Sequence, residues 1–185
     1  MKQPRLAMGA LVLVGSTLTG CVAVPEENVA TLPSGTSTSP ASNSLSAPLL
    51  EAHNRYRLEV GVPQLTWSES LATASQTWAD RLATSNTFEH SQANGYGENL
   101  WQGTAGAFSL TEMVAAWGDE QADFMPNRPF PEVSTTGNWA DVGHYTQMIW
   151  RDTTEVGCGL ATANGYDVLV CCYTPPGNYQ GEVPF

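Results

Sequence analysis

The chain has 185 residues, of which 42% are hydrophobic, a length that suits one domain with a sizeable core rather than two. Its 18 acidic residues outnumber its 7 basic ones, and so acidic a surface repels phosphate backbones and anionic lipid headgroups. The composition therefore excludes nucleic acid as a partner and leaves a covalent anchor as the route to a membrane.

Residues 1–20 have the pattern of a bacterial lipoprotein signal peptide. Two basic residues precede an apolar run from Leu6 to Val14, which is too short to span a bilayer permanently. The sequence "LTGC" follows, and it resembles the site cut by lipoprotein signal peptidase, so Cys21 is the expected lipidation site. The alternative is an ordinary secretory signal with a chance cysteine, but the small residues directly before Cys21 favour the lipoprotein. We therefore expect an extracytoplasmic lipoprotein, anchored to a membrane of the bacterial cell envelope.

The next segment, residues 21–47, is rich in Ser, Thr and Pro and holds almost no large apolar side chain. Such a composition cannot bury a core, and it predicts a disordered tether. The folded domain is therefore expected to span residues 48–185.

Periodic apolar residues predict three helices after the tether. The first is expected to begin with Ser46 as its N-cap and to end at Gly61. The second has Ser68 as its cap, and the third begins with a capping box between Ser109 and Glu112. Positions expected to face the core in the first two helices are Leu49, Ala52, Tyr56, Leu71, Ser75, Trp78 and Leu82.

Near the C-terminus two β-rich runs flank Asn164-Gly165, a strong hairpin signal. Counting outward from that turn places Cys158 opposite Cys171 in a non-hydrogen-bonded pair, whose spacing suits a disulfide. Cys172 then points to the other face and is expected to be a buried free thiol. The rival pairing of Cys158 with Cys172 would require a bulge.

Several segments, taken in order, resemble one family. They are "HNRYR", "EHS", "GENLW", "WGDE", "GHYTQMIWRDT" and "VLVCCYTPPGNY". Over about residues 49–185 the chain is similar to the CAP superfamily, which comprises cysteine-rich secretory proteins, insect venom allergens and plant pathogenesis-related proteins. The resemblance implies an α+β fold, a three-layer α-β-α sandwich called the CAP or SCP domain. One departure is Cys172, at a position that is usually polar and often Asn in the family.

The resemblance also implies a site in which four residues converge on a cleft: His90, Glu98, Glu120 and His144. Their sequence separations match no local metal motif, and singly each could be an ordinary structural or surface residue. In the family frame, His90 and His144 are expected to bind a divalent metal, with zinc as the candidate. Glu98 and Glu120 would orient the imidazoles from a second shell.

A metal-dependent hydrolase is one alternative, in which Glu98 or Glu120 would take a proton from bound water. Two nitrogen ligands are fewer than the three protein ligands usual for catalytic zinc, and no motif sets a Ser or Cys nucleophile against a base. We therefore favour a metal-binding domain without turnover over an enzyme.

The other alternative is carriage of a small lipid. The connection over residues 121–142 contains Phe124 and Phe130 among prolines, and it resembles the region that binds sterol in some fungal members of the family. A fatty acid is the expected cargo, because bacteria commonly lack sterols. Equally, these aromatic side chains could simply pack the connection onto the domain.

Overall fold

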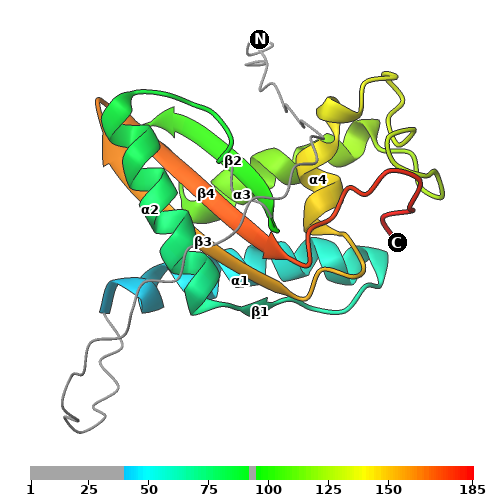
Figure 1. Cartoon of the computed structure of the whole chain (residues 1–185), viewed down its shortest axis with the longest axis horizontal. Helices are drawn as coiled ribbons and strands as arrows, with labels where there is room; N and C mark the ends of the chain where they lie inside the picture. Colours follow the sequence, from blue (N-terminus) through cyan, green and yellow to red (C-terminus); the bar gives the residue numbers. More distant parts are fainter. Residues whose placement is uncertain (1–39, 92–94) are drawn as a thin grey trace, which may run out of the picture.

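A computed structural model describes residues 40–91 and 95–185 of the chain (Figure 1). The predicted signal peptide, Cys21 and most of the predicted tether lie outside these residues. Among the described residues, no helix is both long and apolar enough to cross a membrane. The elements in chain order are α1 (Pro40–Val60), β1 (Thr66–Trp67), α2 (Glu69–Ser85), β2 (Gly97–Thr104), α3 (Leu110–Gly118), the 3-10 helices η1 (Asp119–Asp123) and η2 (Trp139–Asp141), α4 (Gly143–Met148), β3 (Glu155–Ala163) and β4 (Tyr166–Thr174).

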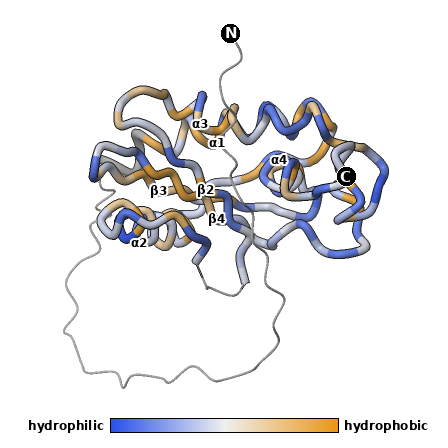
Figure 2. The backbone as a smooth tube through the Cα atoms, turned by 90° about the horizontal axis from the view of Figure 1, so that it is seen from above, coloured by the Kyte–Doolittle hydropathy of each residue, from blue (hydrophilic) through white to orange (hydrophobic). Residues whose placement is uncertain are grey.

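The four strands form one mixed sheet in the order β1-β3-β4-β2, with β1 parallel to β3 and the other pairs antiparallel. Figure 2 shows the strands lying between α2 on one side and α1 and α3 on the other. Each face of the sheet has its own hydrophobic cluster, one with α2 and one with α1, α3 and α4. The predicted three-layer α-β-α sandwich is confirmed.

The first helix is longer than predicted. α1 begins at Pro40, so the expected N-cap at Ser46 is wrong, and Pro48 lies inside the helix. Pro40 is the first residue of α1, and proline suits that position because its missing N–H would have no intrahelical partner there. α1 therefore extends into the segment assigned to the tether. Its other features agree with the sequence: Gly61 follows its end with φ +74°, and the three predicted core positions are buried.

The second and third helices fall where the sequence predicts them. Ser68 occupies the N-cap position of α2, but its side chain makes no capping hydrogen bond. The capping box of α3 is complete, because Ser109 accepts from the backbone of Glu112 and the Glu112 side chain accepts from the backbone of Ser109. α2 lies so close to β3 that a Cβ at Gly157 would come within 2.2 Å of its backbone.

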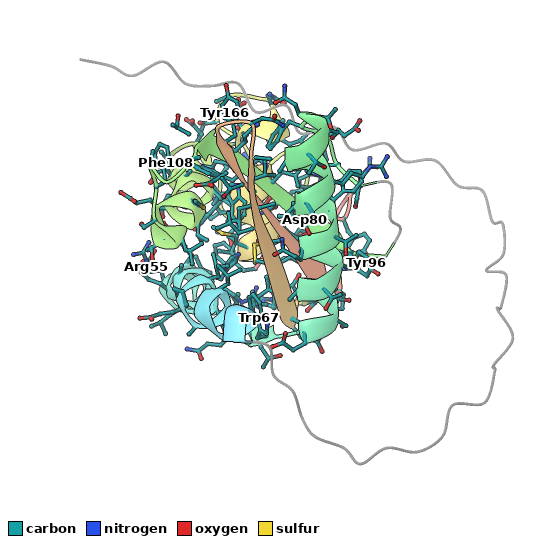
Figure 3. The ribbon with its side chains drawn as sticks, turned by 90° about the vertical axis from the view of Figure 1, so that its left-hand side faces the viewer. Arg55, Trp67, Asp80, Tyr96, Phe108 and Tyr166 are labelled. Atoms are coloured by element: carbon teal, nitrogen blue, oxygen red, sulfur yellow. A yellow bond between two sulfur atoms is a disulfide. The ribbon has the colours of Figure 1, made fainter. Side chains whose placement is uncertain are left out.

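The C-terminal hairpin has the predicted register. Asn164 and Gly165 both have positive φ angles, as a type I′ turn requires, and Cys158 lies opposite Cys171. These two cysteines form the disulfide, with a Cα–Cα distance of 4.1 Å. Figure 3 shows the sulfur–sulfur bond in the interior, on the side of the sheet that faces α1 and α3. Cys172 is a buried free thiol, so the rival pairing with Cys158 is wrong.

Candidate functional site

His144 lies in the first turn of α4, where Glu120 of η1 holds its ring. Nδ1 of His144 is 2.7 Å from Oε1 of Glu120. The other carboxylate oxygen accepts hydrogen bonds from the backbone N–H groups of His144 and Tyr145, each at 3.0 Å. A carboxylate suits this place because the first N–H groups of a helix lack intrahelical partners and carry partial positive charge. Glu120 thus accepts three hydrogen bonds and fixes both the ring and the backbone of His144.

The face of the His144 ring is also fixed. The indole of Trp117 stacks on it, with centroids 6.1 Å apart and an interplanar angle of 16°. Trp117 comes from α3 and donates its Nε1–H to the carbonyl of Leu100 in β2. Only 7% of the His144 side chain is exposed. The imidazole is therefore part of the packed interior as well as of the site.

A second pair joins His90, which precedes β2, to Glu98 in β2. Nδ1 of His90 is 2.7 Å from Oε1 of Glu98, and the same oxygen accepts the backbone N–H of Ser91 at 2.9 Å. Here 26% of the imidazole side chain is exposed, against 9% of the carboxylate side chain. Glu98 therefore holds the His90–Ser91 segment against the start of β2.

One carboxylate oxygen of this pair has no hydrogen-bond partner among the residues that the structure describes. Oε2 of Glu98 is buried and makes no hydrogen bond with the described residues. Glu98 lies opposite Cys172 in the β2–β4 ladder, and burial raises the pKa of the Cys172 thiol to about 11. A buried carboxylate oxygen without a donor is costly, so the described residues satisfy Glu98 less completely than they satisfy Glu120.

β2 connects the two pairs. Glu98 lies between Gly97 and Asn99, and both of these neighbours contact α4. Asn99 donates from Nδ2 to the backbone carbonyl of His144 at 3.1 Å. At Gly97 a Cβ would come within 2.0 Å of the amide end of the Gln147 side chain, so any larger residue would displace that side chain. The start of β2 and the helix that carries His144 are therefore packed directly together.

Both histidines have Nδ1 on a carboxylate, which fixes their tautomer. In the neutral form of each ring, Nδ1–H donates to the glutamate and the lone pair is on Nε2. This is the arrangement that metal-binding histidines usually show, with an outer carboxylate orienting the ring. The described residues contain no group of three or more His, Cys, Asp or Glu side chains that could hold a metal ion. The groups that could bind a metal here are therefore Nε2 of His90 and Nε2 of His144, each on a ring oriented by a glutamate.

The third histidine has a different role. His53 in α1 is fully buried, with Nδ1 2.7 Å from the Leu49 carbonyl and Nε2 2.8 Å from the Tyr173 hydroxyl. Burial lowers the pKa of His53 to about 4. The neutral ring donates a hydrogen bond from Nδ1 to the Leu49 carbonyl, and its Nε2 accepts one from the Tyr173 hydroxyl. Both nitrogens are used, so His53 is structural.

The aromatic side chains of the 121–142 connection pack onto the domain. Phe130 is buried in a cluster with Val133, Val142 and Trp150. The Phe124 ring packs against the rings of Tyr145 and Phe185, with centroid distances of 5.4 and 5.8 Å. Their apolar surface is therefore largely covered by neighbours from the same chain.

Sequence reasoning did not identify the residues that support the pairs. Trp117 and Asn99 contact His144 directly, and Asn178 binds the first turn of α4. The only sequence signal was their place inside the quoted motifs "WGDE", "GENLW" and "PPGNY", which carry no indication of which backbone groups they meet.

Comparison with known proteins agrees with this fold. The profile of "CAP: Cysteine-rich secretory protein family" matches residues 50–173. Pathogenesis-related protein 1A of Nicotiana tabacum is 38% identical over 138 residues, covering 74% of this chain and 78% of that protein. Pathogenesis-related protein 1 of Arabidopsis thaliana is 34% identical over 137 residues, covering 74% and 80% respectively.

Among solved structures, the crystal structure of NaASP2 with Zn2+ superimposes with a TM-score of 0.67 at 23% identity, covering 82% of this chain and 90% of that one. This likeness shows the shared fold. The secretory description of the family and the disulfide both agree with a location outside the cytoplasm. The chain belongs to the CAP family of cysteine-rich secretory proteins.

Proposed function

We propose that this CAP domain binds a divalent metal, zinc being the candidate, through Nε2 of His90 and Nε2 of His144. The observation that carries the proposal is the matched pair of Nδ1 to Oε1 contacts, each 2.7 Å long. In both pairs the carboxylate accepts a hydrogen bond from Nδ1–H, and the neutral ring then has the Nε2 lone pair free for a metal. Zinc also accompanies a protein of the same fold, NaASP2.

Metal binding without turnover is the form of the proposal that the residues support. Two imidazoles leave the remaining positions of a tetrahedral ion to water or to a ligand. A hydrolase would also need a group in reach of the reacting atoms. Glu120 accepts three hydrogen bonds, two from backbone N–H groups of α4 and one from the His144 ring, so both of its carboxylate oxygens are already used. Oε2 of Glu98 has no hydrogen-bond partner among the described residues, so Glu98 is the carboxylate to which a proton-transfer role would fall.

Calorimetric titration with zinc at pH 7.5 and 5.5 tests the metal site. We expect binding at pH 7.5 that weakens at pH 5.5, because protons compete for imidazole, whose reference pKa is about 6.5. His90→Ala and His144→Ala should remove most of the binding. Glu98→Gln and Glu120→Gln should weaken it by about 10 to 100-fold.

Two exposed carboxylates provide matched controls for these glutamate variants. Glu89 is next to His90 and Asp119 is next to Glu120, and both are exposed. Glu89→Gln and Asp119→Asn remove the same charge from the same segments, so they should leave zinc affinity unchanged. Circular dichroism at both pH values checks that each variant is folded. Absence of zinc heat in the folded parent at pH 7.5 rejects the metal site.

The proposal includes lipid anchoring through Cys21 in a bacterial envelope, which rests on the signal pattern of residues 1–20. Stable attachment needs more than one acyl chain, as a mature lipoprotein has. Cys21→Ser should therefore release the protein from the membrane fraction. Equal membrane association of the variant and the parent would contradict the anchor.

Lipid carriage receives no support from the packed Phe124 and Phe130, and we do not include it.

A further inference from the structure

α4 is too short to be stable by its own hydrogen bonds. It has six residues, and helices of this length depend on tertiary contacts. Arg57 of α1 donates to the carbonyl of Met148, the last residue of α4, at 2.9 Å, and to that of Trp150, two residues beyond it, at 2.8 Å. Glu120 holds the N–H groups at its N-terminal end. The orientation of His144 therefore depends on side chains from outside the helix.

The chain that follows β4 supplies another part of this support. Asn178 donates from Nδ2 to the carbonyl of Gly143 at 2.9 Å, and its Oδ1 accepts the hydroxyl of Thr146 at 2.8 Å. One residue earlier, the N–H of Gly177 donates to Oε1 of Gln147 at 2.9 Å. We call Gly177 and Asn178 the clasp. It binds α4 on both sides of His144 in sequence.

Backbone geometry shows that the clasp needs these residue types. Asn178 has φ +59°, a left-handed conformation that asparagine tolerates better than most residues. A Cβ at Gly177 would lie 2.7 Å from the ring of Trp150. Asparagine at 178 therefore combines a tolerated backbone with a side chain that both donates and accepts.

We propose that Asn178 is a positioning residue for His144. Its amide holds the carbonyl of Gly143, directly before His144, and the hydroxyl of Thr146, two residues after it. With the first turn fixed, Nδ1 of His144 stays on Glu120 and the ring stays stacked on Trp117. The part of this inference that concerns zinc rests on the proposed function, whereas the orientation of the ring belongs to the metal-free protein.

Asn178→Gly separates the side chain from the backbone, because glycine adopts positive φ without strain. In the full chain, labelled with 15N-histidine and free of metal, NMR reports the tautomer of each ring and the exchange of its Nδ1 proton. We expect mixed tautomers and faster exchange at His144 alone, with His53 and His90 unchanged. Zinc affinity should fall by about tenfold, the lower end of the effects of outer-shell residues.

Asn127→Gly is the matched control. Asn127 also has φ +59° and is exposed in the 121–142 connection, so the same change is made at the same backbone angle without touching α4. Thr146→Val removes one of the two hydrogen bonds that Asn178 makes to α4, and it should give a smaller change at His144.

Two outcomes would overturn the proposal. In one, His144 of Asn178→Gly keeps the tautomer and proton exchange of the parent. In the other, all three histidines change equally, which would indicate general loosening. If the parent binds no zinc but His144 responds to Asn178→Gly, the metal function fails and the positioning role is supported.

Discussion

The two histidine–carboxylate pairs have equal bond lengths but opposite burial. Near the start of β2 the acid is the buried partner, with 9% of the Glu98 side chain exposed against 26% for His90. At α4 the imidazole is buried, with 7% of His144 exposed against 19% for Glu120. The first histidine is attached to the surface of the fold, and the second is part of its interior. Changes at His144 should therefore affect the fold and the site together, whereas changes at His90 should affect the site alone.

The largest expected difference between the pairs is in stability. His144→Ala should lower the free energy of unfolding by about 2–4 kcal/mol, as other large-to-small changes in packed interiors do. It removes the ring stacked on Trp117 and leaves Glu120 without its imidazole partner. His90→Ala should cost less than about 1 kcal/mol, as is usual for partly exposed residues. Urea denaturation without metal measures both, and equal losses would contradict the comparison.

Acid sensitivity comes next, and one source of it is His53 in α1. Burial lowers the pKa of His53 to about 4 from 6.5, so below pH 6.5 the unfolded chain takes up a proton that the folded chain does not. The contribution of His53 to the free energy of unfolding is therefore fully present above pH 6.5. It decreases as the pH falls toward 4, by up to about 1.4 kcal/mol per pH unit.

Subtracting a variant isolates this contribution. The difference in unfolding free energy between the parent and His53→Gln should decrease as the pH is lowered from 6.5 to 4.5. A pH-independent difference would show that His53 does not titrate as its burial requires. The two pairs are best compared above pH 6.5, where His53 is neutral in both folded and unfolded chains.

The glutamates sharpen the comparison further. Glu120 uses both oxygens, so the amide nitrogen of Glu120→Gln faces either two backbone N–H donors or Nδ1 of His144, which can accept from it only if the ring changes tautomer. Either arrangement loses native hydrogen bonds, at a cost of about 1–3 kcal/mol. Within residues 40–91 and 95–185 Glu98 uses only Oε1, so Glu98→Gln can keep both of these hydrogen bonds and put the amide nitrogen at the position of Oε2. That change should stay within about 0.5 kcal/mol of the parent. Thermal unfolding at pH 7.5 compares them, and a larger loss for Glu98→Gln would reverse the assignment.

The smallest expected effect concerns Cys172, which lies opposite Glu98 beneath the first pair. Burial raises the pKa of its thiol to about 11, so the thiolate is scarce at pH 8 and a thiol reagent should not label the native protein. In a chain with Cys21→Ser, denaturant should expose this one thiol beside the intact disulfide, and Cys172→Ala should expose none. Labelling of the native Cys21→Ser chain would contradict the burial of Cys172.

Much of the fold follows from short stretches of sequence. The Asn164-Gly165 turn sets the register of the hairpin, and that register brings Cys158 opposite Cys171. The capping box at Ser109 marks the start of α3. These features involve residues close in sequence or joined by one turn, so local geometry is sufficient to predict them. The start of α1 was misplaced because a run of small residues before Ser46 is compatible with both tether and helix.

The four site residues can be identified from sequence only as a set of family positions, which gives the chemistry of their side chains but not their contacts. The tertiary structure decided which glutamate each histidine meets, that both contacts use Nδ1, and that Oε2 of Glu98 has no described partner. It also decided that Asn178 holds the turn that carries His144. The physical reason is distance along the chain: these bonds join residues eight to 35 positions apart, and hydrogen-bond geometry over such separations is set by how the sheet and helices pack rather than by any local pattern.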